Sequence, residues 1–192
     1  MVCRILIEGL TLVSSNATLV NFPQEMFNDA MHFLEEAKKL STSSDNDFLR
    51  WRYLRASIIY SLTSLEAFVN TLIAGLIAEK LKLPNVANDF ANKERMGMVA
   101  KLERIFPLIT GKEIDKTKPE WIDLQTVRNI RNRLVHYTGG TEIYNDNDPY
   151  GVNISNAEKG IRMVRGMVRQ LCALLGENPP IWVERIESRI IR

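Results

Sequence analysis

The chain has 192 residues, of which 45% are hydrophobic, and 25 lysines and arginines against 23 aspartates and glutamates give a net charge of +2. This length suits one domain with a sizeable core, and the mild charge excludes a protein that wraps nucleic acid over a large basic surface. The two cysteines, Cys3 and Cys172, supply neither a disulfide framework nor a metal cluster. We therefore expect a reducing, cytoplasmic compartment, no bound metal and no cofactor.

The first 22 residues differ in composition from the rest of the chain. The opening run MVCRILIEGLTLV is interrupted by Glu8, so it lacks the continuous apolar core and the cleavage site of a signal peptide. We expect residues 1–22 to form an extended arm or a short hairpin. Residues 23–192 are expected to form a single helical domain.

Helical periodicity dominates the chain after this arm. Apolar spacing, prolines and glycines predict helices at about 23–40, 48–83, 92–106, 119–137 and 155–175, and a short one from about residue 180. Pro107 and Gly111 are expected to end the third helix, and Gly176 to cap the fifth. The predicted fold is all-α, an up-down bundle of four to five main helices with a short N-terminal extended segment.

The second predicted helix is apolar enough to raise the question of a membrane span. Residues 58–78 carry Glu66 and Asn70 near their centre, and both side chains are costly in hydrocarbon. A buried helix of a soluble protein is the preferred interpretation, and no contact with a membrane is expected.

The last two turns of the fourth helix contain the residues of greatest chemical interest, Arg128-Asn-Ile-Arg-Asn-Arg-Leu-Val-His136. An imidazole, with an ordinary pKa of about 6.5, can transfer a proton at neutral pH, and a guanidinium can bind phosphate through a planar fork of donors. The spacing alone is weak evidence, because a histidine near a helix C-terminus is often only a favourable partner of the helix dipole.

An ideal helix separates the parts of this segment. Asn129, Asn132 and His136 share one polar stripe, whereas Arg131 lies in the apolar sector, about 140° from His136. Two groups that diverge in this way need a second wall to form one site. A symmetric dimer would supply it, because an isologous interface places the same stripe of two subunits face to face.

A core-facing arginine also needs a partner of opposite charge, because an unpaired buried charge is very costly. Glu66 on the second helix is the expected partner of Arg131, and Asn70 lies one turn further along. A purely structural ion pair between two core helices is the alternative role for Glu66.

Three features of these residues resemble the HEPN superfamily, helical-bundle domains many of which are RNases of toxin-antitoxin or antiphage systems. Arg131-Asn132-Arg-Leu-Val-His136 resembles the family's Arg-x4-6-His motif. The segment YSLTSLEAFVN, residues 60–70, is similar to the family's upstream helix with its recurrent acidic position. The third feature is the order of the helices, and together the three cover roughly residues 25–175.

The resemblance implies a metal-independent RNA endonuclease that acts at a dimer-interface cleft and leaves 2',3'-cyclic phosphate ends. It implies that His136 serves as general base or acid, that Arg131 stabilises the phosphorane and that Asn132 orients the scissile phosphate. The supporting positions are Arg128, Asn129, Glu66 and Asn70. Tyrosine modification is not expected, because Tyr137 follows the histidine directly and Thr138 occupies the place of the tyrosine that some members carry.

The same resemblance implies an RNA substrate, a homodimer, and an antitoxin or nucleotidyltransferase as a further partner. Two other functions stay open on the residues alone. One is a non-catalytic HEPN module that binds RNA, a nucleotide or a partner protein, and the other is a purely structural dimerisation domain.

Overall fold

The computed structural model describes residues 21–41, 44–81, 96–135 and 151–184, and within these ranges all regular secondary structure is helical. The all-α prediction is therefore confirmed for the described part of the chain. The predicted N-terminal arm, His136 and most of the loop after it lie outside these residues.

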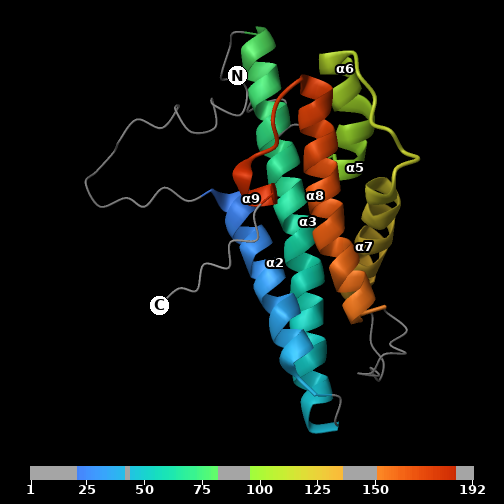
Figure 1. Cartoon of the computed structure of the whole chain (residues 1–192). Helices are drawn as coiled ribbons and strands as arrows, with labels where there is room; N and C mark the ends of the chain where they lie inside the picture. The colour runs from blue at the N-terminus through green and yellow to red at the C-terminus, as the bar shows by residue number, and fades with distance from the viewer. Residues whose placement is uncertain (1–20, 42–43, 82–95, 136–150, 185–192) are drawn as a thin grey trace.

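Four long helices form an up-down bundle (Figure 1): α2 (Phe22–Lys39), α3 (Ser44–Leu81), α7 (Pro119–Val135) and α8 (Ile154–Leu175). α3 and α8 run in one direction, and α2 and α7 run in the other. α3 and α8 pack against each other, and each of them also packs against both α2 and α7. The last short helix, α9 (Ile181–Glu184), returns beside the beginning of α2.

A composite helix between α3 and α7 contains a correction to the sequence prediction. α5 (Met98–Ala100) continues through a π-helical segment η1 (Lys101–Ile105) into α6 (Phe106–Thr110), so Pro107 lies near the start of α6 instead of ending the helix. The backbone N–H of Phe106 bonds to the carbonyl of Lys101, five residues earlier. The wider π turn changes the pattern of backbone hydrogen bonds just before Pro107, whose nitrogen cannot donate one. The helix ends at Gly111, which has a φ of 70°.

The helix ends follow their sequence signals. Asn21 caps α2, and Asn153 caps α8 by accepting a hydrogen bond from the backbone N–H of Asn156 at 2.9 Å. α8 ends at Gly176, whose φ of 76° lies in the left-handed region that glycine tolerates best. The predicted limits of these two helices are correct to within about two residues, the usual scatter of helix ends.

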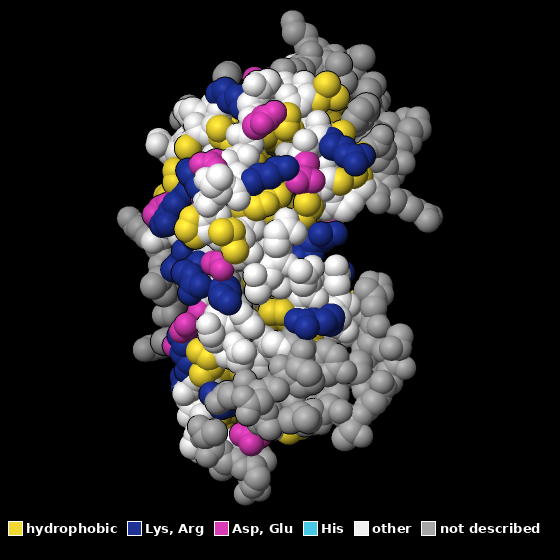
Figure 2. Space-filling model, turned by 90° about the vertical axis from the view of Figure 1, so that its right-hand side faces the viewer, with side chains coloured by type: hydrophobic (Ala, Val, Ile, Leu, Met, Phe, Trp, Pro, Cys, Tyr) yellow, Lys and Arg dark blue, Asp and Glu magenta, His cyan; other side chains and the backbone are white. Residues whose placement is uncertain are grey.

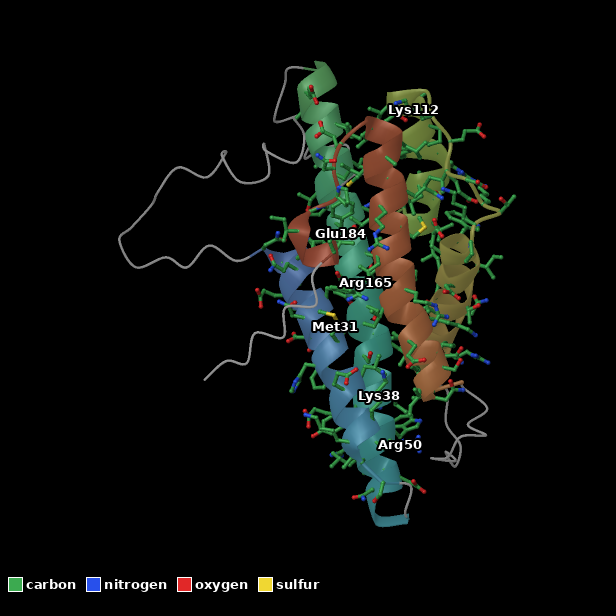
Figure 3. The ribbon with its side chains drawn as sticks, viewed as in Figure 1. Met31, Lys38, Arg50, Lys112, Arg165 and Glu184 are labelled. Atoms are coloured by element: carbon green, nitrogen blue, oxygen red, sulfur yellow. The ribbon has the colours of Figure 1, made fainter. Side chains whose placement is uncertain are left out.

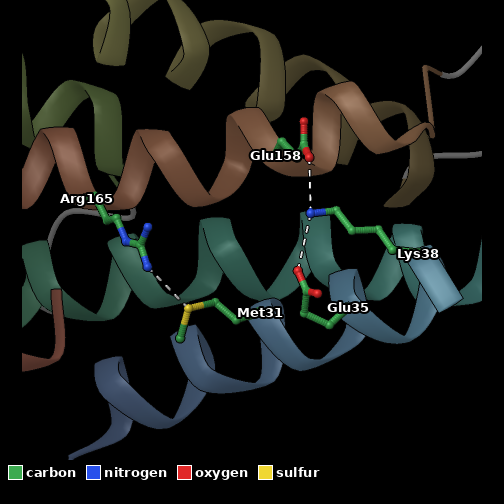
Figure 4. Close-up of polar contacts among 5 residues, drawn as sticks. All are labelled: Met31, Glu35, Lys38, Glu158 and Arg165. Atoms are coloured by element: carbon green, nitrogen blue, oxygen red, sulfur yellow. Dashed lines mark hydrogen bonds and ion pairs between the residues drawn. The ribbon is translucent and has the colours of Figure 1, made fainter. Parts of the chain in front are cut away.

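Charged side chains also occur between α2 and α8 (Figure 4). Lys38 Nζ lies 3.2 Å from Glu35 and 3.1 Å from Glu158 of α8. Partial burial is the largest single effect and lowers the pKa of Lys38, but the hydrogen bonds to the two carboxylates together raise this pKa above its ordinary value. Arg165 of α8 lies beside Met31, with Nη2 3.6 Å from the sulfur. Burial is the largest cause of a lowered pKa at Arg165, and the neighbouring Arg169 adds to it.

α3 is long and apolar enough to cross a membrane by length and composition, over Asn46–Glu79. In its most apolar window 56% of the residues are buried inside the bundle, as in the core helix of a soluble protein, so this is weak evidence for a span.

Candidate functional site at the end of helix α7

The candidate site lies on the last two turns of α7. The helix begins at Pro119, which suits a first turn, and its apolar residues Leu124, Val127 and Ile130 are buried against the bundle. The predicted apolar stripe is thus confirmed for these three residues. It fixes the rotation of α7, and with it the direction of every polar side chain on the helix.

Arg131 and Asn132 lie together at this end of the helix, and both are partly buried. Nη1 of Arg131 donates to Oδ1 of Asn132 at 3.4 Å, a long hydrogen bond. A guanidinium has five N–H donors, so others remain for a ligand. Arg128 and Asn129, one turn earlier, are exposed. Four of the predicted site residues therefore share the end of one helix, and His136 follows Val135 just beyond the described part of α7.

The expected ion pair between Arg131 and Glu66 is absent from the described residues, and the register of the helices explains why. Position 160 of α8 faces Ser61, and Gly166 of α8 faces Glu120 at the beginning of α7. Glu66, five residues beyond Ser61, therefore lies near the level of Glu120. Arg131 is eleven residues further along α7, about 16 Å away along the axis at 1.5 Å per residue. The helical wheel predicted the right faces, but it contains no information on this offset.

Asn70, which the sequence analysis placed among the supporting positions of the site, contacts η1 and not α7. Its Oδ1 accepts a hydrogen bond of 2.8 Å from Nζ of Lys101, in the π-helical segment. Asn70 therefore joins α3 to η1, at the far end of the bundle from Arg131. Glu66 and Asn70 are not part of the arrangement around Arg131 in one chain.

Basic residues occur at both ends of the bundle, and the end where α7 ends is named the basic end because Arg128, Arg131 and Arg133 of α7 lie there. Lys38 and Arg50 lie there, and Lys112 lies at the opposite end (Figure 3). On the side that carries α6 and α7, basic side chains occur over the whole length of the surface (Figure 2). Two acidic groups near this end are already paired, because Glu35 and Glu158 bind Lys38. Nearer the beginning of α7, Asp123 lies 3.5 Å from Nη2 of Arg162.

Sequence reasoning missed the contribution of α3 to this basic end. Arg50, Arg52 and Arg55 lie in the first turns of α3, in a stretch without any acidic residue from Phe48 to Leu65. That absence is visible in the sequence. It has meaning only once the structure places these arginines beside the end of α7.

The chemistry available here is phosphate binding. No group of three or more histidine, cysteine, aspartate or glutamate side chains able to hold a metal ion occurs among the described residues. Guanidinium groups and an amide can hold a phosphate and stabilise charge that develops on it. Proton transfer would depend on His136, which lies two residues after Leu134 in the sequence.

Comparisons with protein-family models, with curated proteins and with solved structures found no match for this chain. The residues at the end of α7 and their arrangement therefore indicate the function of the chain.

Proposed function

We propose that this protein is a metal-independent RNA endonuclease of HEPN type, a toxin or antiphage effector that acts in the cytoplasm as a homodimer. One observation carries the proposal: Arg131 and Asn132 are joined by a hydrogen bond and partly exposed at the end of α7, five and four residues before His136 in the chain. A purely structural helix end has no need of a guanidinium, an amide and an imidazole together.

The reaction assigns a separate task to each group. His136 removes the proton of the 2'-hydroxyl or protonates the leaving 5'-oxygen, a contribution of about 10² to 10⁴ in rate. The 2'-oxygen attacks the adjacent phosphorus, the bond to the 5'-oxygen breaks, and a 2',3'-cyclic phosphate remains. Arg131 binds the charge that develops on the phosphorane, and Asn132 holds Arg131 in place while its amide N–H groups face the phosphate.

The outer face of α7 supports the proposed homodimer. Ile122 is 59% exposed there, and Asn129, seven residues further along, is exposed on the same side. An apolar side chain beside polar ones suits a symmetric interface in which two α7 helices meet. The second copy would bring its own end of α7 to the same cleft, which one chain leaves half built.

Cleavage of total RNA in EDTA tests the nuclease. The wild type should produce fragments with 2',3'-cyclic phosphate ends, and His136→Ala should abolish them. His32→Ala is the matched control, because His32 is the other histidine of the chain and is exposed on α2. RNA that stays intact at high protein concentration, but is bound, would leave the non-catalytic HEPN module as the better account.

A sedimentation experiment tests the dimer separately. A homodimer at micromolar concentration is expected, and Ile122→Glu should shift it towards the monomer, because it places a charge in the apolar part of the interface. A wild-type chain that stays monomeric would contradict the shared cleft.

A further inference from the structure

Two neighbouring helix segments at the basic end of the bundle contain arginines and no acidic residue. The first is residues 48–65 of α3, and the second is residues 124–135 of α7. Their six arginines are Arg50, Arg52, Arg55, Arg128, Arg131 and Arg133. Arginine binds phosphate through two parallel hydrogen bonds and stacks on planar groups, so it suits a nucleic acid better than lysine does.

The register of the helices brings the two segments to the same level. Ile130 of α7 contacts the position of Gly151, just before α8, and Gly160 of α8 contacts Ser61 of α3. Nine residues back from Ser61 is Arg52, which therefore lies near the level of Ile130. α3 also packs directly against α7. The register thus places Arg52 at the level of the end of α7.

The rotation of α3 turns Arg52 towards the side of the bundle that carries α7. Arg52 precedes Asn70 by 18 residues, which is five whole helical turns, so the two side chains leave α3 in the same direction. Asn70 bonds to Lys101 of η1, on the α5–α7 side. On α7, Arg128 follows the buried Trp121 by seven residues and Leu124 by four, so it lies at the edge of the buried face of α7 and is itself exposed.

An exposed aromatic ring lies within the same surface. The guanidinium carbon of Arg52 lies 4.3 Å from the centre of the Phe48 ring, and Phe48 is 44% exposed. One turn further, the guanidinium of Arg55 lies over the buried Trp51 at 4.5 Å. A guanidinium that lies over an accessible ring adds to a platform on which an unpaired base can stack.

We infer that this surface, Phe48, Arg52 and Arg55 of α3 with Arg128 and Arg131 of α7, binds a single-stranded segment of RNA. The arginines of both helices meet its phosphates, and an unpaired base stacks on the ring of Phe48, over which Arg52 lies. The inference rests on the proposed nuclease function, and it adds the substrate class and the residues that hold the strand beside the reacting phosphate. A duplex fits less well, because pairing hides the faces of its bases.

Fluorescence anisotropy with a labelled single-stranded RNA of about 12 nucleotides tests this surface, a length near the site size of single-strand binders. The protein carries His136→Ala so that it cannot cleave the probe. Arg52→Gln with Arg55→Gln should weaken binding about tenfold and lower the slope of log K against log salt by about 1.4, since each lost phosphate contact contributes about 0.7. A loss of affinity without this change of slope would overturn the assignment of phosphate contacts.

The matched control removes the same charge elsewhere. Arg104 and Lys118 are exposed outside the basic end, and Arg104→Gln with Lys118→Gln should leave affinity within about twofold. An equal loss in this control would mean that only the net charge matters, and would overturn the proposed surface. Thermal unfolding of each variant verifies that the bundle is intact.

A separate variant tests whether a base stacks on Phe48. Phe48→Leu keeps an apolar side chain but removes the aromatic face, and it should weaken binding to the single strand about fivefold or more while the salt dependence stays the same. The same RNA annealed to its complement should bind more weakly and be insensitive to Phe48→Leu. Equal binding of strand and duplex, unaffected by this variant, would refute base stacking.

The two proposals fail in different ways. If RNA is cleaved normally when Arg52, Arg55 and Phe48 are replaced, the proposed binding surface is refuted and the proposed nuclease activity stands. If RNA is bound through these residues but never cleaved, the proposed nuclease activity is refuted and the binding surface stands.

Discussion

Gly160 of α8 lies so close to Ser61 of α3 that a Cβ at position 160 would come within 2.8 Å of Ser61 Oγ and 3.0 Å of Ser61 Cβ. Ser61 is fully buried, and its hydroxyl donates to the carbonyl of Ser57 at 2.8 Å. The two central helices therefore touch almost backbone to backbone at this point. This contact fixes the register from which the positions of Glu66, Arg52 and Arg131 all follow.

Gly160→Ala should lower the free energy of unfolding by about 1 to 3 kcal/mol, because an extra methyl group in a closely packed contact forces the helices apart. The higher helix propensity of alanine offsets this by up to about 1 kcal/mol. Urea unfolding measures the change. Adding Ser61→Gly removes the opposing atoms and should restore part of the loss, whereas Gly97→Ala, with no atom within 4 Å of the new Cβ, should change stability little. A fully stable Gly160→Ala variant would contradict the close contact.

α9 depends on one aromatic side chain. Trp182 is 9% exposed, and its ring centre lies 5.5 Å from that of Phe27 and 6.3 Å from that of Phe68. Trp182→Ala should cost about 3 to 5 kcal/mol of unfolding free energy, as large truncations in a core do. The adjacent Ile181 is 67% exposed, and Ile181→Ala should leave the melting temperature almost unchanged. Similar losses in the two variants would show that Trp182 does not belong to the core.

Substitutions on one face of α3 distinguish the expected partner of Arg131 from the observed contacts. Glu66→Gln should change the unfolding free energy by less than about 0.5 kcal/mol, because its carboxylate forms no ion pair with Arg131. Asn70→Ala should cost about 1 kcal/mol, the typical contribution of one hydrogen bond, by removing the acceptor for Lys101. Chemical denaturation gives the free energy of unfolding of both variants, which differ from wild type on the same helix, α3. A loss of several kcal/mol on Glu66→Gln would instead support a buried ion pair between Glu66 and Arg131.

The sequence predicts local features of each helix well, but it does not predict how far one helix is shifted along its axis relative to another. A helix cap is a local feature, so the prediction that Gly176 caps α8 is confirmed, whereas the caps Asn21 and Asn153 are identified from the structure. The buried face of α7 follows from apolar periodicity alone. The axial offset between helices is different, because it is set by how closely α3 and α8 approach, and the sequence shows Gly160 and Ser61 without showing that they meet. The wrong partner for Arg131 and the missed Arg52 share this cause.

The ion pair between Arg169 and Glu184 should make the attachment of α9 depend on pH. Both nitrogens of the guanidinium edge donate to the carboxylate at 2.7 Å, and this hydrogen bonding lowers the pKa of Glu184 below its ordinary 4.5. A lowered folded-state pKa means that the stabilisation is complete above 4.5 and is lost as the pH falls through the lower, folded value. The melting temperatures of wild type and Glu184→Gln should therefore converge as the pH is lowered below 4.5. Because both side chains are exposed, the difference at neutral pH should be small, and a gap that widens on acidification would contradict the pairing.

The hydrogen bond between Arg131 and Asn132 makes a specific prediction about catalysis. Asn132→Ala removes the acceptor at 3.4 Å and leaves the guanidinium in place but less well oriented, so RNA cleavage should fall by about tenfold, equivalent to about 1.4 kcal/mol. Arg131→Ala removes the charge that stabilises the phosphorane and should cost about 10² to 10³. Asn28→Ala, at an equally partly buried asparagine on α2 and outside the site, is the matched control and should cleave within about threefold of wild type. If Asn132→Ala and Asn28→Ala had the same effect, Asn132 would have no positioning role, and the Arg131–Asn132 pair would be a feature of the helix end alone.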